Sequence, residues 1–461
     1  MKFRQEKDSM GQLNVPDEAL YGATTQRALL NFPISDLRFN RTFIKSLAEI
    51  KLCAAKTNLE LGEIEKNIAD EIIKAAESVS NGDHDKEFVV DIFQTGSGTS
   101  TNMNTNEVIS NVAIKNLGGV IGSRDPIHPN DHVNKGQSSN DVIPSAIHIA
   151  GCVGITGSLI PSLEKLKDSL SRKSEEFWNV IKTGRTHLQD ATPIRLGQEF
   201  LGYSGQIEES IKRAKISLNE LSVLALGGTA VGTGIGMQKG FSNKVIEKLS
   251  KRFEIGFTES PNHFHSQSTI DAIVSSSGNL KTIAVSLMKI GNDIRWLGSG
   301  PRAGIGEIEL PEVQPGSSIM PGKVNPVIAE SLTMACAQVI GNDQTINIAG
   351  QSGNFELNVM MPIAAYNLLQ SIDLLAASSN NFAIQCIDGL KSTNKGPKSV
   401  QNGLAICTAL APKIGYDNAA KIAHIASETG ETILEVAKRE TSYSHDELVS
   451  ILNAESMTEP T

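Results

Sequence analysis

The sequence is poor in aromatic residues and cysteine, and it lacks the runs that mark membrane or secreted proteins. Aromatic residues make up 5% of the chain, and its five cysteines are scattered without a Cys-x-x-Cys spacing. A dispersed, odd set of cysteines indicates reduced thiols, so we expect a cytoplasmic protein. We find no apolar run of transmembrane length and no signal-peptide core in the first residues, and we therefore expect no membrane partner.

A basic character is also missing, because the net charge is −9 and the pI is about 5.6. This balance argues against nucleic acid or an anionic membrane as the main partner, although a local cationic site for a small dianion remains compatible with it. Metal-ligand spacings do not stand out either, since His263 and His265 form a weak pair without a third ligand in register. We expect neither a metal nor a cofactor.

Clear strand patterns are absent, whereas helical periodicity is plentiful. Apolar residues recur every three or four positions in two early segments, 43–54 and 64–79. Five longer segments show near-heptad apolar seams: residues 159–170, 207–225, 280–297, 332–349 and 368–386. Seams of this kind pack at shallow crossing angles. The predicted fold class is therefore mainly α, with an elongated central five-helix bundle flanked by two smaller, mostly helical domains.

These patterns divide the chain into three predicted domains. They are an N-terminal mostly helical domain at residues 1–137, a central long-helix bundle at residues 138–395 and a small C-terminal helical domain at residues 396–461. In the last domain we expect helices at residues 417–428, 431–438 and 444–452, the third capped by Ser444.

One loop, residues 316–326, gathers two hydroxyls, a lysine, a side-chain amide and two glycines. Pro315 and Pro321 exclude a helix there, and Asn325 followed by Pro326 predicts an N-cap and the first turn of a new helix. A lysine and a helix N-terminus beside such a loop favour a carboxylate or phosphate ligand. A phosphate-binding P-loop is excluded by spacing, because five residues rather than four precede Gly-Lys and Val324 follows. A flexible linker is the alternative interpretation.

Three further blocks are dense in small polar side chains: residues 95–102, residues 128–131 continuing to 137–141, and residues 183–190. Each by itself is typical of a capped turn. His187 in the third block is a candidate acid or base because imidazole titrates near neutrality; the alternative is a histidine that caps a helix beginning near residue 192. The Gly-x-Gly-x-Gly run within residues 229–236 follows a helix rather than a strand, which excludes a dinucleotide site there.

Residues 316–326 resemble the signature of the fumarase/aspartase superfamily, and Pro-Gly-Lys-Val-Asn at residues 321–325 resembles class II fumarases. The three polar blocks resemble superfamily blocks in the same order, and so does Asp-Ser-Met-Gly at residues 8–11. The resemblance covers nearly the whole chain. It implies a homotetramer with a shared helical core, a small dicarboxylate substrate and active sites built from several subunits.

The resemblance also implies roles for individual residues. Ser317 is implied as the carbon base, and His187 as a catalytic residue paired with Glu330 of a neighbouring subunit. The implied substrate-binding residues are Ser97, Gly98, Thr99, Ser138, Ser139, Asn140, Thr186, Ser318, Lys323, Val324 and Asn325. A second, non-catalytic anion site is implied at His128, Pro129, Asn130 and Asp131. Asp125 departs from the family pattern there, since relatives often carry a basic residue at that position.

The activity implied by the resemblance is a metal-independent hydro-lyase of the tricarboxylic acid cycle that hydrates fumarate reversibly to (S)-malate. An aspartate ammonia-lyase is the alternative within the superfamily, but aspartases usually carry glutamine at the position of His187 and alanine at that of Gly322. A non-catalytic helical scaffold is a third hypothesis, against which the intact set of Ser317, Lys323 and Glu330 argues.

Overall fold

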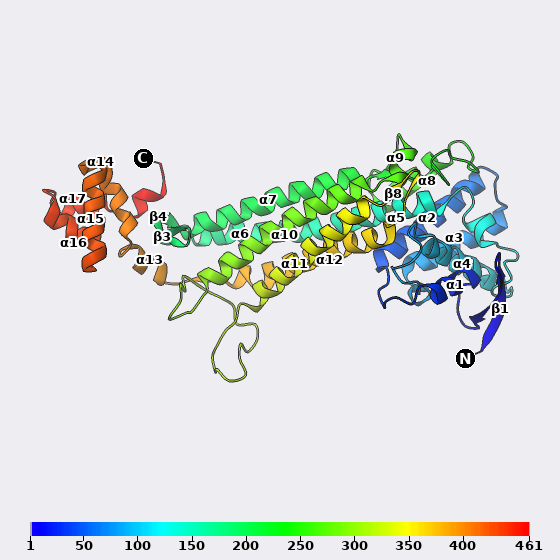
Figure 1. The fold of residues 1–461 in the computed structure, drawn as a ribbon, viewed down its shortest axis with the longest axis horizontal. Coiled ribbons are helices and arrows are strands. Elements are labelled where there is room, and N and C mark those ends of the chain that lie inside the picture. The colour runs from blue at the N-terminus through cyan, green and yellow to red at the C-terminus, as the bar shows by residue number, and fades with distance from the viewer. Residues whose placement is uncertain (1, 461) are drawn as a thin grey trace. The chain divides into compact units, whose positions relative to one another are not determined.

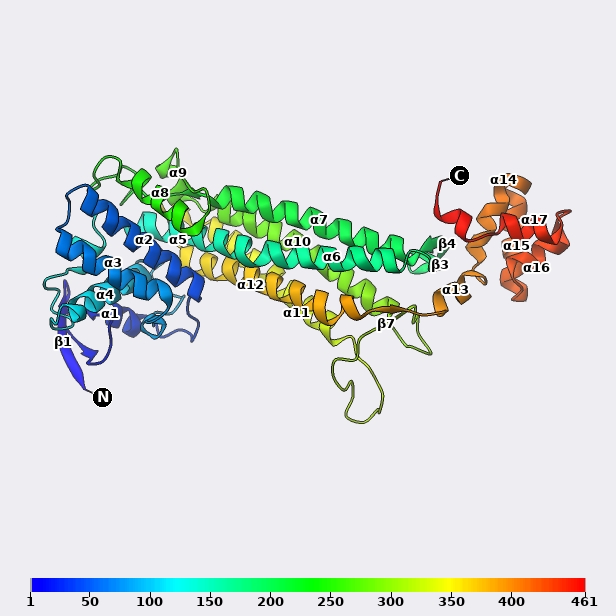
Figure 2. The same ribbon diagram turned by 180° about the vertical axis from the view of Figure 1, so that it is seen from behind.

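The computed structural model describes residues 2–460, which form two compact units. Unit 1 comprises Met1–Pro161, Lys212–Ala284 and Ala337–Ala376, and unit 2 comprises Ser162–Ile211, Val285–Cys336 and Ala377–Thr461. Five long helices contribute residues to both units: α6 (Ile160–Glu176), α7 (Leu196–Leu221), α10 (Asp271–Leu297), α11 (Val327–Gly350) and α12 (Met361–Gln385). They confirm the five predicted long helices and are labelled in Figures 1 and 2.

Unit 1 contains the early helices expected from residues 43–54 and 64–79. Its remaining elements are β1 (Phe3–Asp8), β2 (Gly11–Pro16), α1 (Ala23–Asn31), α2 (Arg41–Glu60), α3 (Lys66–Asn81), α4 (Thr99–Asn116), the π-helical turn η2 (Pro129–Val133), α5 (Ser139–Gly154), β5 (Val223–Leu224), α8 (Phe241–Phe253), β6 (Thr258–Glu259), α9 (His263–Ser268), β8 (Gly353–Asn354) and β9 (Leu357–Asn358).

Unit 2 contains one hairpin and the C-terminal helices. Its α-helices and strands besides the long helices are β3 (Ile181–Thr186), β4 (Gln189–Arg195), β7 (Ile308–Glu309), β10 (Lys391–Ser392), α13 (Lys395–Val400), α14 (Ala411–Ile414), α15 (Tyr416–Thr429), α16 (Ile433–Glu440) and α17 (His445–Ile451). Helices α15 to α17 confirm the three expected C-terminal helices. Ser444 caps α17 in a capping box with Glu447, as the sequence predicted.

Strands were underestimated from the sequence. The structure has antiparallel hairpins β1–β2 and β3–β4, besides three pairs of two-residue strands. A sheet of two strands buries little of either face, so it leaves no clear alternation of apolar and polar residues. The β1–β2 hairpin, for example, buries only Glu6 and Val15 among its twelve residues.

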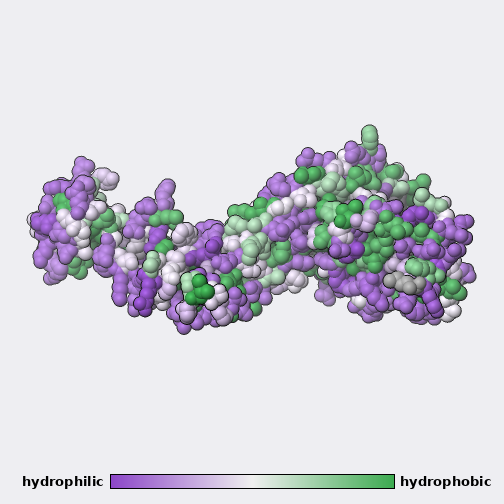
Figure 3. Space-filling view, turned by 60° about the horizontal axis from the view of Figure 1, so that its bottom comes forward, coloured by the Kyte–Doolittle hydropathy of each residue, from purple (hydrophilic) through white to green (hydrophobic). Residues whose placement is uncertain are grey.

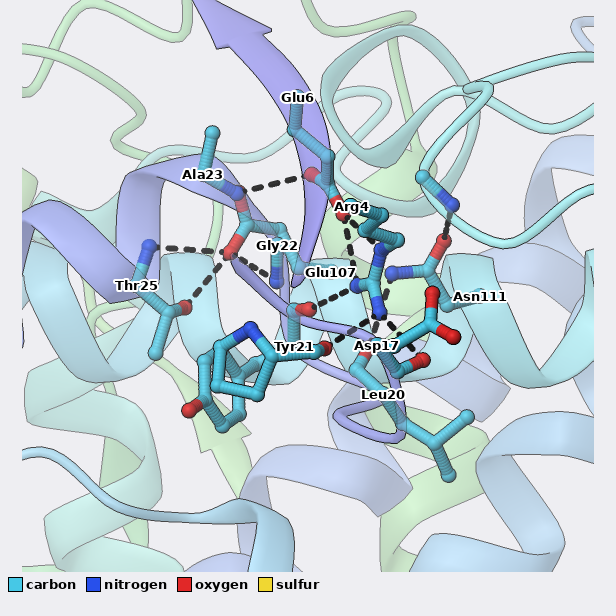
Figure 4. Close-up of polar contacts among 12 residues, drawn as sticks. Arg4, Glu6, Asp17, Leu20, Tyr21, Gly22, Ala23, Thr25, Glu107 and Asn111 are labelled. Atoms are coloured by element: carbon cyan, nitrogen blue, oxygen red, sulfur yellow. Dashed lines mark hydrogen bonds and ion pairs between the residues drawn. The ribbon is translucent and has the colours of Figure 1, made fainter. Parts of the chain in front are cut away.

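Two buried carboxylates hold the N-terminal segment of unit 1 in place (Figure 4). Glu107 of α4 accepts hydrogen bonds from the backbone N–H groups of Gly22, Thr24 and Thr25, at 2.9, 2.9 and 3.0 Å, and from Thr25 Oγ1 at 2.6 Å. Glu6 accepts from the N–H of Ala23 at 2.9 Å. These carboxylates satisfy the free N–H groups at the start of α1. Their negative charges also interact favourably with the positive N-terminal end of the helix dipole.

The core helices also correct the expectation that no apolar segment reaches transmembrane length. The helical run at residues 139–176 contains a window that is long and apolar enough to span a membrane by length and composition, which the sequence reading missed. In the protein 61% of that window is buried. Its apolar character is therefore that of a core helix packed against its neighbours.

Candidate active site

In unit 1, the first turns of α4 and α5 meet through their hydroxyl groups. Ser97 Oγ lies 2.7 Å from Thr99 Oγ1, and Thr99 Oγ1 lies 2.7 Å from Ser139 Oγ. Gly98 precedes α4 in the left-handed region, with φ of 73°, which a glycine adopts without strain. Two helix N-termini with their free N–H groups therefore flank one chain of three hydroxyls, an arrangement that favours an anion.

The start of α5 is fixed by a buried carboxylate that the sequence reading did not single out. Asp141 Oδ1 accepts from the Ser138 N–H at 2.9 Å, while its Oδ2 accepts from the N–H groups of Gly227 and Thr229, each at 3.0 Å. Burial raises the pKa of Asp141, and the three backbone donors oppose this shift. The Ser-x-x-Asp spacing of a capping box was the signal available in the sequence.

The glycine-rich segment near residue 230 also reaches this site. Asn140 Nδ2 donates to the carbonyl oxygen of Ala230 at 2.8 Å, so its amide is held at the first turn of α5. The segment is a loop between β5 and α8, as the sequence predicted. The structure thus brings together Ser97, Gly98, Thr99, Ser138, Ser139 and Asn140 of the predicted substrate-binding set.

The predicted second anion site lies at turn η2, also in unit 1. His128 Nδ1 accepts from the N–H groups of Asn130 and Asp131, both at 3.2 Å, and Pro129 opens the turn. A ring nitrogen that accepts from two backbone donors carries no proton, so the neutral imidazole carries its proton on Nε2. Burial is the main cause that lowers the pKa of His128, and the charge of Arg124 adds to it.

In unit 2, His187 lies in the two-residue turn that joins β3 to β4. His187 and Leu188 both have positive φ, 56° and 59°, and Thr186 pairs with Gln189 across the turn. Asn-Gly pairs favour such turns, whereas non-glycine side chains there cost about 1–3 kcal/mol each. Strain of this kind is typical of functional positions. The helix-capping alternative for His187 is wrong, because β4 extends to Arg195 before α7 begins.

A buried ion cluster anchors this hairpin. Arg185 makes two hydrogen bonds to Glu307, at 2.7 and 3.0 Å, and Lys182 Nζ lies 2.9 Å from Glu307 and 2.7 Å from Glu199. The side chains of Lys182 and Glu307 are 1% and 3% exposed. Burial raises the pKa of Glu199, while Lys182 pulls it down. The cluster fixes β3 against α7 and residue 307. The sequence offered no sign that Arg185 pairs with Glu307, because the two residues are 122 positions apart.

The loop at residues 316–326 folds back on itself. A Cβ at Gly316 would lie 1.9 Å from the Lys323 carbonyl oxygen, so only glycine fits there, and Asn325 Nδ2 donates to the Gly316 carbonyl at 2.5 Å. Ser317 Oγ accepts from the N–H groups of Ile319 and Met320 at 3.2 and 3.0 Å. Hydrogen bonds of this kind favour a negatively charged oxygen.

The expected N-cap of the following helix is wrong by one residue. Helix α11 begins at Val327, and its first backbone bond runs from the Glu330 N–H to the Pro326 carbonyl at 3.0 Å. Pro326 therefore precedes the helix, and the Asn325 side chain spans the loop instead of capping.

A cleft of about 690 Å³ in unit 2 contains part of the predicted site. Lys323, Val324, Asn325 and Glu330 line it together with Arg295 of α10. Arg295 gave no signal in the sequence, because an arginine on a polar helix face is ordinary. Two cations beside the N-terminus of α11 suit an anionic ligand.

His187 is not joined to this cleft within one chain. Among residues 2–460, no hydrogen bond or ion pair links the His187 side chain to Ser317, Lys323 or Glu330, and His187, Thr186 and Ser318 are exposed. A single chain therefore supplies separate parts of the predicted site in unit 2.

The comparisons identify the class of protein. A family model described as Lyase matches residues 11–341, and one described as Fumarase C C-terminus matches residues 406–459. Fumarate hydratase class II of Rickettsia bellii (strain RML369-C) is 50% identical over 456 residues, covering 99% of this chain and 98% of the relative. Mitochondrial fumarate hydratase of Rhizopus oryzae is 50% identical, covering 95% of this chain and 89% of the relative.

Solved structures agree with these sequence matches. A crystal structure of recombinant class II fumarase from Schistosoma mansoni aligns with a TM-score of 0.96 at 40% identity, covering 99% of both chains. A fumarate lyase:delta crystallin from Brucella melitensis bound to cobalt aligns with a TM-score of 0.95 at 41% identity. Fold and matches together define a helical lyase. Within that class, the chain belongs to the class II fumarate hydratase family.

Proposed function

We propose that the protein catalyses the reversible hydration of fumarate to (S)-malate. The observation that carries this proposal is the meeting of two helix N-termini at the Thr99–Ser139 hydroxyl pair, 2.7 Å apart, in a chain whose relatives are named fumarate hydratase. Free N–H groups, hydroxyls and the Asn140 amide are suited to a carboxylate that gains charge during the reaction. The ammonia-lyase alternative is not favoured, since the relatives at about 50% identity are hydratases.

In the direction of fumarate formation, the proposed reaction removes a proton from the carbon beside one carboxylate and then expels the hydroxyl group as water. Ser317 Oγ takes the carbon proton, and the N–H groups of Ile319 and Met320 stabilise its alkoxide. The electron pair moves into the adjacent carboxylate, which Lys323 and Asn325 stabilise. His187, oriented by Glu330 of a neighbouring subunit, protonates the departing hydroxyl group, so water leaves.

The substrate carboxylates are bound, in this proposal, by the polar groups at the predicted positions. These are Ser97, Gly98, Thr99, Ser138, Ser139, Asn140, Thr186, Ser318, Lys323, Val324 and Asn325. The second anion site at His128, Pro129, Asn130 and Asp131 remains part of the proposal. Arg124 supports this site, because its charge acts on His128. It also places a cation next to Asp125, the position at which relatives often carry a basic residue.

We propose a homotetramer in which several subunits complete each site. Four long helices leave large apolar side chains exposed: Leu201 and Ile216 on α7, Val285 and Trp296 on α10, Met334 and Ile348 on α11, and Ile384 on α12. Figure 3 shows apolar residues at the surface among polar ones. Exposed apolar side chains on helices favour association.

The five free cysteines support a reducing compartment, and we propose the cytoplasm.

Ultraviolet absorbance of the conjugated double bond of fumarate tests the activity. With purified protein, we expect absorbance to rise on addition of (S)-malate and to stay flat with aspartate. A Ser317→Ala preparation made in the same way is the control for a contaminating host enzyme, and it should show no rise. A rise with aspartate and none with malate would overturn the hydratase proposal, and no rise with either would favour the scaffold.

A further inference from the structure

Lys51 of α2 is a buried cation that the proposed mechanism does not use. Its side chain is 0% exposed, and Nζ donates to Asn134 Oδ1 at 2.8 Å and to Gln137 Oε1 at 3.0 Å. Within residues 2–460, no carboxylate oxygen lies within ion-pair distance of this ammonium group. Burying a charge without an opposite charge is costly, so either a nearby anion or loss of the proton offsets this cost.

The hydrogen bonds of Lys51 place it behind both helix N-termini of the candidate site. Gln137 directly precedes Ser138, which caps α5. Asn134 Oδ1 also accepts from Asn102 and Asn106 of α4, both at 3.3 Å, and Asn102 lies in the turn that begins at Thr99. Lys51 therefore connects to both sides of the Thr99–Ser139 hydroxyl pair through neutral amides.

Among the described residues 2–460, the charged groups on the surrounding elements leave Lys51 without an ion-pair partner. Asp141 of α5 acts on Lys51 at a distance, but its oxygens accept from backbone N–H groups. Glu49, on the same helix, is engaged by Arg252 of α8 and Ser80 of α3. The groups that α4 and the turn before α5 present to Lys51 are the amides already named.

We propose that Lys51 is a positioning residue whose positive charge is completed by the bound dicarboxylate, so that binding of the dianion is coupled to proton uptake by Lys51. This inference rests on the proposed function of the same site. Burial lowers the pKa of Lys51 to about 7, with Asp141 opposing the shift, so the free protein is about half protonated there at neutral pH. A dianion nearby favours the charged form and raises this pKa.

Thermodynamic linkage between protonation of Lys51 and binding of the dianion fixes the sign and size of the change in affinity. If the dianion raises the pKa of Lys51 by about one unit, protonation of Lys51 strengthens binding about tenfold in return. The KM for fumarate should therefore rise with pH above about 7, where the free lysine loses its proton. A lysine that only fixes Asn134 and Gln137 would not produce this dependence.

Calorimetric titration with succinate, a saturated four-carbon dicarboxylate, measures the proton uptake directly. Titrations at pH 7 in two buffers of different ionisation enthalpy should show that the protein takes up about half a proton more per site than Lys51→Met does. Lys51→Met should also raise the KM for fumarate about fivefold at pH 7, where only about half of the free protein carries the charge, and remove its rise with pH. Lys45→Met, at an exposed position on the same helix, is the matched control and should behave as the unchanged protein.

Equal proton uptake by the unchanged protein and Lys51→Met, with the same pH profile of KM, would overturn the inference. If Lys51→Met fails to fold, Lys51→Gln replaces it, and absence of proton uptake by the unchanged protein overturns the inference without any variant. Failure of the proposed function is a separate result, because the unchanged protein would then not hydrate fumarate at all.

Discussion

His187→Asn should lower the turnover of fumarate about 10²–10⁴-fold while leaving the protein folded and assembled, because it removes one acid–base group. Asparagine adopts positive φ more readily than histidine, so the strained turn with φ of 56° at this position keeps its shape. The loss of turnover then reports chemistry rather than a broken hairpin. Initial rates and size-exclusion chromatography measure the two properties.

Leu188→Asn is the matched control, since it changes the second strained residue of the same turn, with φ of 59°, and keeps the imidazole. Its turnover should stay within about twofold of the unchanged protein because Leu188 supplies no proton-transfer group. A His187→Asn protein with more than about a tenth of the original turnover would contradict the acid–base role. Loss of assembly in His187→Asn alone would make the histidine structural.

Glu307→Ala should lower the free energy of unfolding by about 3–5 kcal/mol, because it leaves buried cations without their carboxylate. Lys182 is 1% exposed and lies 2.9 Å from Glu307, and Arg185 loses a bidentate partner. Denaturant titration at fixed protein concentration measures the change.

Glu309→Ala provides the control for this measurement. Glu309 lies two residues away on β7, exposed to solvent, and its removal should change the free energy of unfolding by at most about 0.5 kcal/mol. Equal stabilities for Glu307→Ala and Glu309→Ala would show that the ion cluster does not hold the β3–β4 hairpin.

The sequence predicted the helices well because their apolar seams are long and regular. All five long helices and the cap at Ser444 followed from spacing and local chemistry. The hairpins did not, because the turn at His187 and Leu188 lacks the Asn, Asp or Gly that signals a tight hairpin. The three predicted domains stay a prediction.

The candidate site was predicted in part. Polar residues at helix starts, such as Thr99 and Ser139, are recognisable because caps have local signatures. Partners far apart in the chain, such as Arg185 and Glu307, have no such signature, and only the fold reveals them. Lys51 was missed although it lies among the mostly apolar residues 47–55, where it is fully buried.

The central claim is that parts from different subunits complete one site for a dianion, and mixing two inactive variants tests it most directly. His187→Asn and Lys323→Ala change parts that no hydrogen bond or ion pair joins within residues 2–460 of one chain, and His187 does not line the cleft of Lys323. After joint unfolding and refolding, mixed oligomers should regain hydration of fumarate, because some of their sites receive both native side chains. Mixed oligomers that form but stay as inactive as the two parent variants would contradict the account.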